Sequence, residues 1–248
     1  ILWTHVVPID PEAAGLGLEV EVASDAGFAH VVKRAHGLAL ADDDFTARIR
    51  VDGLASATRY HYRFRAIGSK PWLRVKSRAG SFVTAPDPAA AAPVRFVISG
   101  DSNLGYTRPR DLDFHVLSAA ASESPTPDFF VYFGDTIYSD SGVLPGGDAV
   151  TLPEYREIHR LTRADAHLQE LLATTGTFTG WDDHEVHNDY AGETVDPARF
   201  EAGARAFFEY LPVREQVGHA PWRIDRRVRW GRDVELFFVD GRQFRSQE

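Results

Sequence analysis

The hydrophobic rhythm of this chain changes at a short stretch, PDPAAAAP, which occupies residues 86–93. Before this stretch apolar and polar residues alternate with period 2, and after it short continuous apolar runs alternate with stretches of helical character. The stretch itself has too few large apolar side chains to form a core, and its prolines stiffen it. We therefore expect two domains, at residues 1–85 and 94–248, joined by a linker at 86–93.

The first 85 residues predict antiparallel strands with one buried and one wet face. Leu18, Val20 and Val22 alternate with polar neighbours, and the alternation recurs over residues 45–51 and 60–65. Because one face of each strand is apolar, the strands should pack face to face. Short turn-forming segments separate them, which favours a small all-β sandwich over a barrel.

The region after the linker predicts an α/β layer architecture, because short apolar strands alternate with helices there. The expected strands are residues 95–101, 128–135 and 177–183, and the expected helices are residues 113–122 and 153–173. Two further strands are expected between residues 222 and 244, on either side of a turn at 230–232.

Acidic residues stand where each of the three apolar runs ends. Asp101 ends the first run, Asp135 the second, and the pair Asp182 and Asp183 the third. Ligands of open α/β sheets bind at the carboxyl ends of the strands, where these loops converge. Carboxylates at close range repel one another unless cations lie between them. A metal site is therefore the economical interpretation.

The residue types around these strand ends indicate which metals could bind. Asp135 and Tyr138 are three apart in a turn, so a carboxylate and a phenolate could share one ion. A phenolate ligand points to a strong Lewis acid, ferric iron above all, since the phenol pKa is near 10. The block WDDHEVHND at 181–189 adds histidine, which suits Zn or Fe, and carboxylate and amide oxygens, which suit Ca or Mg. Taken alone, Asp101 is also typical of a cap, and Tyr138 of packing.

These motifs together resemble the PhoD-like alkaline phosphatases and phosphodiesterases of the calcineurin-like metallophosphoesterase superfamily. LWTHV and GLASATRYHYRFRA are similar to the N-terminal domain of that family, GDTIY and WDDHEVHND to its metal motifs, and VELFFVDGRQFR to a following strand. The resemblance implies a fibronectin-III-like β-sandwich followed by an α/β layered metallophosphoesterase domain. It also implies secretion or a periplasmic location, although residues 1–7 lack the pattern of a signal peptide.

The resemblance also implies the roles of individual residues. It places metal ligands at Asp101, Asp135, Tyr138, Asp183 and Asn188. Asp135 would bridge two metals, Tyr138 would bind the ferric ion, and Asp101 would stand where family members commonly have cysteine. The expected cofactors are two or more metal ions, Fe³⁺ together with Ca²⁺, Zn²⁺ or Mn²⁺. His184 would lie nearest the reacting phosphate.

We therefore expect metal-dependent hydrolysis of phosphate monoesters or diesters by a metal-activated hydroxide, with His184 protonating the leaving oxygen. Arg108 and Arg110 could contact the phosphate of the substrate as forked donors. One alternative is a phosphatase that uses Thr136 as its nucleophile. Another is a noncatalytic binding module with a degenerate phosphoesterase domain.

Composition excludes several other functions. Cysteine is absent, so neither disulfides nor thiolate chemistry is available. The formal net charge is −9 and the basic residues are scattered, which argues against binding of nucleic-acid duplexes. No apolar run is long enough to span a membrane, and no pattern indicates the oligomeric state. Methionine is also absent, so we expect the sequence to be part of a longer chain. The resemblance implies that further metal ligands follow Glu248, the alternative being a molecule that does not complete its site.

Overall fold

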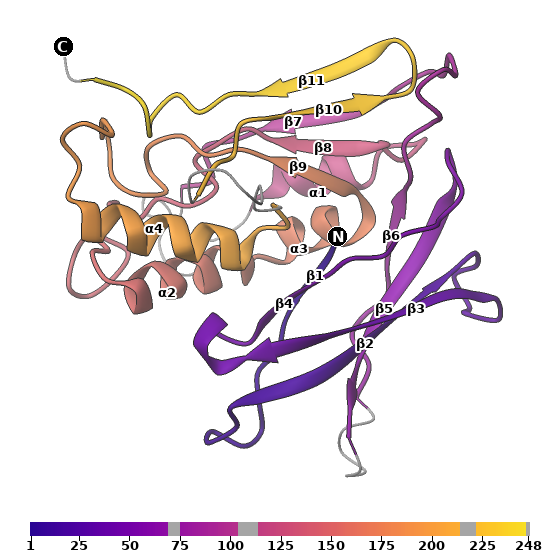
Figure 1. Ribbon diagram of the computed structural model, residues 1–248, viewed down its shortest axis with the longest axis horizontal. Helices are drawn as coiled ribbons and strands as arrows, with labels where there is room; N and C mark the ends of the chain where they lie inside the picture. The colour runs from indigo at the N-terminus through magenta and orange to yellow at the C-terminus, as the bar shows by residue number, and fades with distance from the viewer. Residues whose placement is uncertain (69–74, 104–113, 214–221, 247–248) are drawn as a thin grey trace.

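The computed structural model describes residues 1–68, 75–103, 114–213 and 222–246. Its N-terminal part contains two antiparallel sheets (Figure 1). The smaller sheet pairs β1 (Leu2–His5) with β4 (Thr46–Ile49). The larger has the order β3-β2-β5-β6, with bounds Gly15–Ala23 for β2, Val31–Leu40 for β3, Arg59–Ile67 for β5 and Gly80–Val83 for β6. A 3₁₀ turn, Ala41–Asp43, joins β3 to β4.

The predicted alternation builds one apolar core between these two sheets. Leu18 and Val20 of β2 pack with Ala47, Ile49 and Phe64, which β4 and β5 contribute. This arrangement agrees with the expected packing of amphipathic strands, while the fibronectin-III-like description stays a prediction.

The polar face of the larger sheet, which lies opposite the core, is less exposed to solvent than the alternation predicts. Glu19 and Glu21 are 6% and 7% exposed. Cross-strand arginines cover them, because Arg65 donates to Glu19 at 2.7 Å and Arg63 to Glu21 at 2.8 Å. The long apolar stems of these arginines shield the carboxylates while their charges compensate them.

The part after the linker is built on a three-stranded parallel sheet of order β7-β8-β9. The bounds are Phe96–Ser99 for β7, Phe129–Tyr132 for β8 and Gly176–Thr179 for β9. An antiparallel hairpin follows, with β10 at Arg226–Trp230 and β11 at Val234–Phe238. All five expected strands are therefore present, in the expected order.

Layers cover both faces of the central strand β8, which explains why its sequence is continuously apolar. Phe130 and Tyr132 pack with Leu168 and Leu171, whereas Phe129 and Val131 pack with Trp230 of the hairpin. Figure 1 shows the β10–β11 hairpin on one side of the parallel sheet and helices on the other.

The helices differ from the sequence expectations in two places. Their bounds are His115–Ala121 for α1, Leu152–Arg163 for α2, Ala166–Thr174 for α3 and Pro197–Tyr210 for α4. The single helix expected over 153–173 is wrong, because Asp165 caps a new helix by accepting from Leu168 N at 2.7 Å. Helix α4 was not expected, although Asp196 and Pro197 form a typical helix start.

The two parts contact each other through strand β1 and through the turn after β3. Arg156 of α2 donates to the carbonyl oxygen of Asp42 at 2.5 Å, and Trp3 donates to the carbonyl oxygen of Glu209 at 2.7 Å. Asp44 accepts hydrogen bonds from Arg160 and Tyr210. Among the described helices, none is both long and apolar enough to cross a membrane.

Candidate metal centre

The carboxyl ends of the three parallel strands bring the predicted acidic residues together. Asp101 follows β7, Asp135 follows β8 and Asp183 follows β9. Asp101 and Asp135 have positive φ values of 55° and 49°, which non-glycine residues rarely adopt. Such backbone strain is typical of residues held in place for function.

Gly134 allows the loops after β8 and β9 to approach each other closely. Its φ is +149°, and a Cβ atom built on it would lie 2.9 Å from the backbone nitrogen and from Cβ of Asp182. Any side chain at this position would therefore push the two loops apart. The glycine of the GDTIY motif thus has a steric role in forming the site.

Tyr138 connects two of the carboxylates. Its hydroxyl group lies 3.0 Å from Asp101 Oδ1 and 3.3 Å from Asp135 Oδ2. Burial of the ring raises the pKa of Tyr138 above its usual value, and the hydrogen bonds to both carboxylates raise it further. The phenol is therefore protonated in the protein without metal, and a phenolate would require a strongly Lewis-acidic ion.

Asp135, Asp183 and His184 form a group that could hold a cation. One ligand atom from each lies within 4.8 Å of those of the other two. Burial raises the pKa of Asp135 to about 6, the imidazole of His184 opposes that rise and the carboxylate of Asp183 adds to it. The crowded carboxylates therefore fit a bound cation, which would remove their repulsion.

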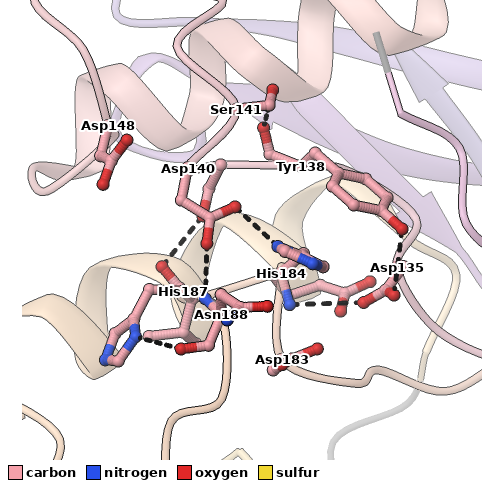
Figure 2. A network of polar contacts seen from close by, with 12 residues as sticks. Asp135, Tyr138, Asp140, Ser141, Asp148, Asp183, His184, His187 and Asn188 are labelled. Carbon is pink, nitrogen blue, oxygen red and sulfur yellow. Dashed lines mark hydrogen bonds and ion pairs between the residues drawn. The ribbon is translucent and has the colours of Figure 1, made fainter. Parts of the chain in front are cut away.

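Asp140, which the sequence analysis did not select, orients His184 and the following loop (Figure 2). Its Oδ1 lies 2.6 Å from His184 Nδ1, and its Oδ2 accepts from Asn188 N at 2.5 Å. The imidazole also stacks on Tyr138, with ring centroids 4.0 Å apart. Burial lowers the pKa of His184, but the hydrogen bond and charge of Asp140 outweigh it, so the net shift is upward.

Asn188 is exposed, and its side-chain nitrogen donates to Asp189 Oδ2 at 2.9 Å. The structure therefore places Asn188 in the loop beside the cluster, with its backbone held by Asp140. Its expected role as a metal ligand stays a prediction.

Arg242 is a second residue that the sequence analysis missed. Its Nε lies 2.6 Å from Asp182 Oδ1, and its Nη2 lies 3.3 Å from Asp183 Oδ2. The guanidinium therefore neutralises part of the acidic loop from the segment after β11. The DGR sequence after β11 was the one sequence feature that pointed to Arg242. The sequence does not show its pairing with Asp182, because about sixty residues separate the two.

Glu185 is the third residue that the sequence analysis missed. Its carboxylate holds Thr136 in place through two hydrogen bonds. Glu185 is 1% exposed and accepts from the backbone nitrogen of Thr136 at 2.6 Å and from its hydroxyl at 2.7 Å. Asp182 N donates to the other carboxylate oxygen at 2.9 Å. Because Thr136 is fully buried and its hydroxyl is engaged, the geometry opposes its role as a nucleophile.

Arg108 and Arg110, the expected substrate contacts, lie outside the described residues.

Comparisons with known proteins agree with this arrangement. Residues 97–248 match the family described as PhoD-like phosphatase, and residues 1–86 match its N-terminal domain. The chain is 26% identical over its full length to alkaline phosphatase D of Bacillus subtilis (strain 168), covering 45% of that protein. A solved structure of PhoD matches with a TM-score of 0.84 and 25% identity, over 98% of this chain and 49% of that one.

A more distant structure shows the fold alone. It is a purple acid phosphatase from yellow lupin (Lupinus luteus) seeds, which matches with a TM-score of 0.53 and 13% identity over 88% of this chain and 38% of its own. Together these findings define a metallophosphoesterase-like fold of mixed sheets and helices. The chain belongs to the PhoD-like phosphatase family, which confirms the resemblance found in the sequence. It spans about half the length of the relatives that it matches.

Proposed function

We propose that this chain carries part or all of the metal centre of a phosphoric ester hydrolase that acts on phosphate monoesters or diesters. The observation that carries the proposal is the group of Asp135, Asp183 and His184, whose ligand atoms lie within 4.8 Å of one another. Tyr138 extends this group to Asp101 through its hydrogen bonds. Membership of the PhoD-like phosphatase family supports the same reaction class.

The donor set fits two hard or borderline cations. We propose that Asp101, Asp135 and Tyr138 hold ferric iron, and that Asp135, Asp183 and Asn188 hold Ca²⁺, Zn²⁺ or Mn²⁺. Bound cations of this kind lower the pKa of a coordinated water and neutralise charge on phosphoryl oxygens. Gly134 lets the loops after β8 and β9 approach each other closely, which brings the proposed ligands on these loops together.

His184 is the proposed proton donor to the leaving oxygen. Asp140 holds its Nδ1, which leaves Nε2 as the nitrogen that can face a substrate. The upward pKa shift keeps the imidazole protonated to higher pH, as a general acid requires. The same nitrogen could instead bind a metal, and metal content separates the two roles: His184→Gln should keep the full metal content if the residue acts as an acid.

Hydrolysis of p-nitrophenyl phosphate and of bis(p-nitrophenyl) phosphate tests the proposal. We expect Asp135→Asn to reduce the rate on the preferred ester at least a hundredfold and to lower the metal content. Asp148→Asn, which changes an exposed carboxylate near the site in Figure 2, is the matched control. Equal rates for the parent and Asp135→Asn would contradict the proposal, and absence of turnover in metal-loaded parent protein would favour the noncatalytic binding module.

The iron assignment has a separate test. A phenolate bound to ferric iron gives the protein a charge-transfer colour, and Tyr138→Phe removes the phenolate while keeping the ring. Loss of the colour in Tyr138→Phe is the expected result. If iron-loaded parent protein is colourless, or if the colour survives the substitution, a pair of divalent ions is the better assignment.

Three finer proposals follow, of which the first rests on the change of hydrophobic pattern at residues 86–93 and the other two on the family resemblance. The first is the domain division at residues 1–85, 86–93 and 94–248, and the second is the fibronectin-III-like description of the N-terminal sheets. The third is export from the cytoplasm. Limited proteolysis would test the first, because residues 86–93 form no helix or strand and a cut there should release two fragments.

A further inference from the structure

A cavity of about 510 Å³ lies between the N-terminal sheets and the helices, away from the metal centre. Strands β1 and β5 contribute one wall and helices α2 and α3 the other, and none of its lining residues belongs to the proposed metal centre. A second cavity of about 600 Å³ adjoins it and shares five lining residues. These shared residues are Trp3, Tyr62, Arg163, Leu172 and Tyr210.

The charge of the first cavity is opposite in sign to that of the protein. Arg78, Arg160, Arg163 and His5 line it, and none of its described lining residues is an aspartate or glutamate. The chain as a whole has 36 acidic and 27 basic side chains, so a cavity lined by arginines and histidine without a described aspartate or glutamate is not expected from composition. Asp44 and Glu157 pair with Arg160, and burial lowers the pKa of His5, so Arg163 and the exposed Arg78 supply the positive charge that could attract an anion.

Arg163 is the most unusual of these residues because its charge is buried and, among the described residues, the carboxyl group of Glu185 acts on it only from beyond salt-bridge distance. It is 9% exposed, and no salt bridge joins it to a carboxylate of the described residues. Nη1 lies 2.9 Å from His159 Nδ1, while Nη2 is buried and has no hydrogen-bond partner. Burial lowers the pKa of Arg163 to about 10. An unpaired buried guanidinium destabilises a fold, so a ligand that pairs with it would be strongly favoured.

The remaining walls are largely apolar and aromatic, with Trp3, Tyr62, Phe64 and Leu172 among them. From this combination we propose that the cavity is a second ligand site, which binds a small anion with an aromatic or apolar body, a phosphate ester or a carboxylate. Nη2 of Arg163 could donate to either oxyanion while Nη1 stays on His159, and the apolar walls would bury the rest of the molecule. Because both parts of the chain form the walls, the bound ligand would also hold them together.

Isothermal titration of the metal-loaded protein at constant ionic strength tests this proposal with three probes. Phenylphosphonate and benzoate carry the two oxyanions, and benzyl alcohol is a neutral molecule of similar shape. In Asp135→Asn, whose metal centre is disabled, we expect one site per chain that binds at least one anionic probe ten times more tightly than benzyl alcohol. If phenylphosphonate binds more tightly, the ligand is a phosphorus oxyanion. If benzoate binds more tightly, the ligand is a carboxylate.

Substitutions in the cavity test whether the anionic probe binds there. Arg163→Met should lower the affinity for the anionic probe at least tenfold. It also removes the hydrogen bond to the buried His159, so a cooperative melting transition of the variant shows that it is folded before the titration. Leu172→Trp should reduce the affinity for every probe, because it fills the cavity without altering its charge. Arg227→Met, which removes an exposed guanidinium of β10, is the control and should leave these affinities unchanged.

The Asp135→Asn variant separates this proposal from the proposed function, because the substitution disables only the metal centre. The proposed function could therefore be wrong while the second ligand site exists. Anion binding that persists in Asp135→Asn and is weakened in Arg163→Met supports the second site. Binding that is lost in Asp135→Asn and retained in Arg163→Met would place the probe at the metal centre and overturn the proposal. Equal affinities for benzoate, phenylphosphonate and benzyl alcohol, or no binding of either anion at millimolar concentration, would overturn it as well.

Discussion

Glu185 is a fully buried carboxyl group on the loop that carries Asp183 and His184, and its ionisation should oppose folding. Burial raises its pKa from the ordinary value of 4.5 to about 7, although hydrogen bonds from Thr136 and Asp182 act in the opposite direction. At about 1.4 kcal/mol for each factor of ten in proton affinity, this rise corresponds to about 3 kcal/mol. The side chain is fully buried, so solvent screening does not reduce that figure appreciably.

The sign of the pH dependence follows from proton binding. The folded chain binds the Glu185 proton more tightly than the unfolded chain, so the stabilising contribution is fully present below about pH 4.5 and is lost as the pH rises to about 7. Glu185→Gln cannot ionise. The free energy of unfolding of the parent, relative to that of Glu185→Gln, should therefore fall by about 3 kcal/mol between pH 4.5 and pH 8.

Urea unfolding followed by tryptophan fluorescence, at several pH values and with a chelator present, measures this difference. The variant also loses one hydrogen-bond acceptor, which lowers its stability by about 1–3 kcal/mol at every pH and leaves the slope unchanged. Glu154→Gln is the control, because backbone hydrogen bonds at the start of α2 lower the pKa of Glu154, so its contribution is lost as the pH falls. Parallel curves for the parent and Glu185→Gln would refute the reasoning.

Three further substitutions test other contacts. Thr136→Val should reduce stability by about 1–2 kcal/mol, through the lost hydrogen bond to Glu185, and leave hydrolysis within a few-fold of the parent rate; near-total loss of activity with the metals retained would instead support a nucleophile. Asp140→Asn should lower the rate of hydrolysis about 10- to 100-fold with metal content retained, and a normal rate would show that orientation of the histidine is unimportant. Asp44→Asn should destabilise the chain by about 1–3 kcal/mol in urea unfolding, whereas Asp52→Asn, in an exposed ion pair, should change stability by less than about 1 kcal/mol.

The sequence alone was sufficient to predict the five strands after the linker and the gathering of acidic residues at the ends of the parallel ones. The three apolar runs are recognisable because β8 is covered on both faces, and their carboxyl ends meet because parallel neighbouring strands share one edge. Asp101, Asp135 and Tyr138 could therefore be expected together, and the structure joins them through the Tyr138 hydroxyl. These features depend on local pattern and strand direction, which a sequence displays directly.

Other features depend on which distant residues the fold brings into contact. Arg242 reaches Asp182 across 60 residues of sequence, and Asp140 reaches His184 across 44. Neither pairing leaves a periodic signal, because many arginines and aspartates elsewhere in the chain have the same local surroundings. Arg163 is a similar case, since only the tertiary structure shows that its guanidinium is buried beside His159 and forms no salt bridge with a carboxylate of the described residues. Local pattern thus determined the strands and their ends, while tertiary packing decided which charges are paired, buried or left without a partner.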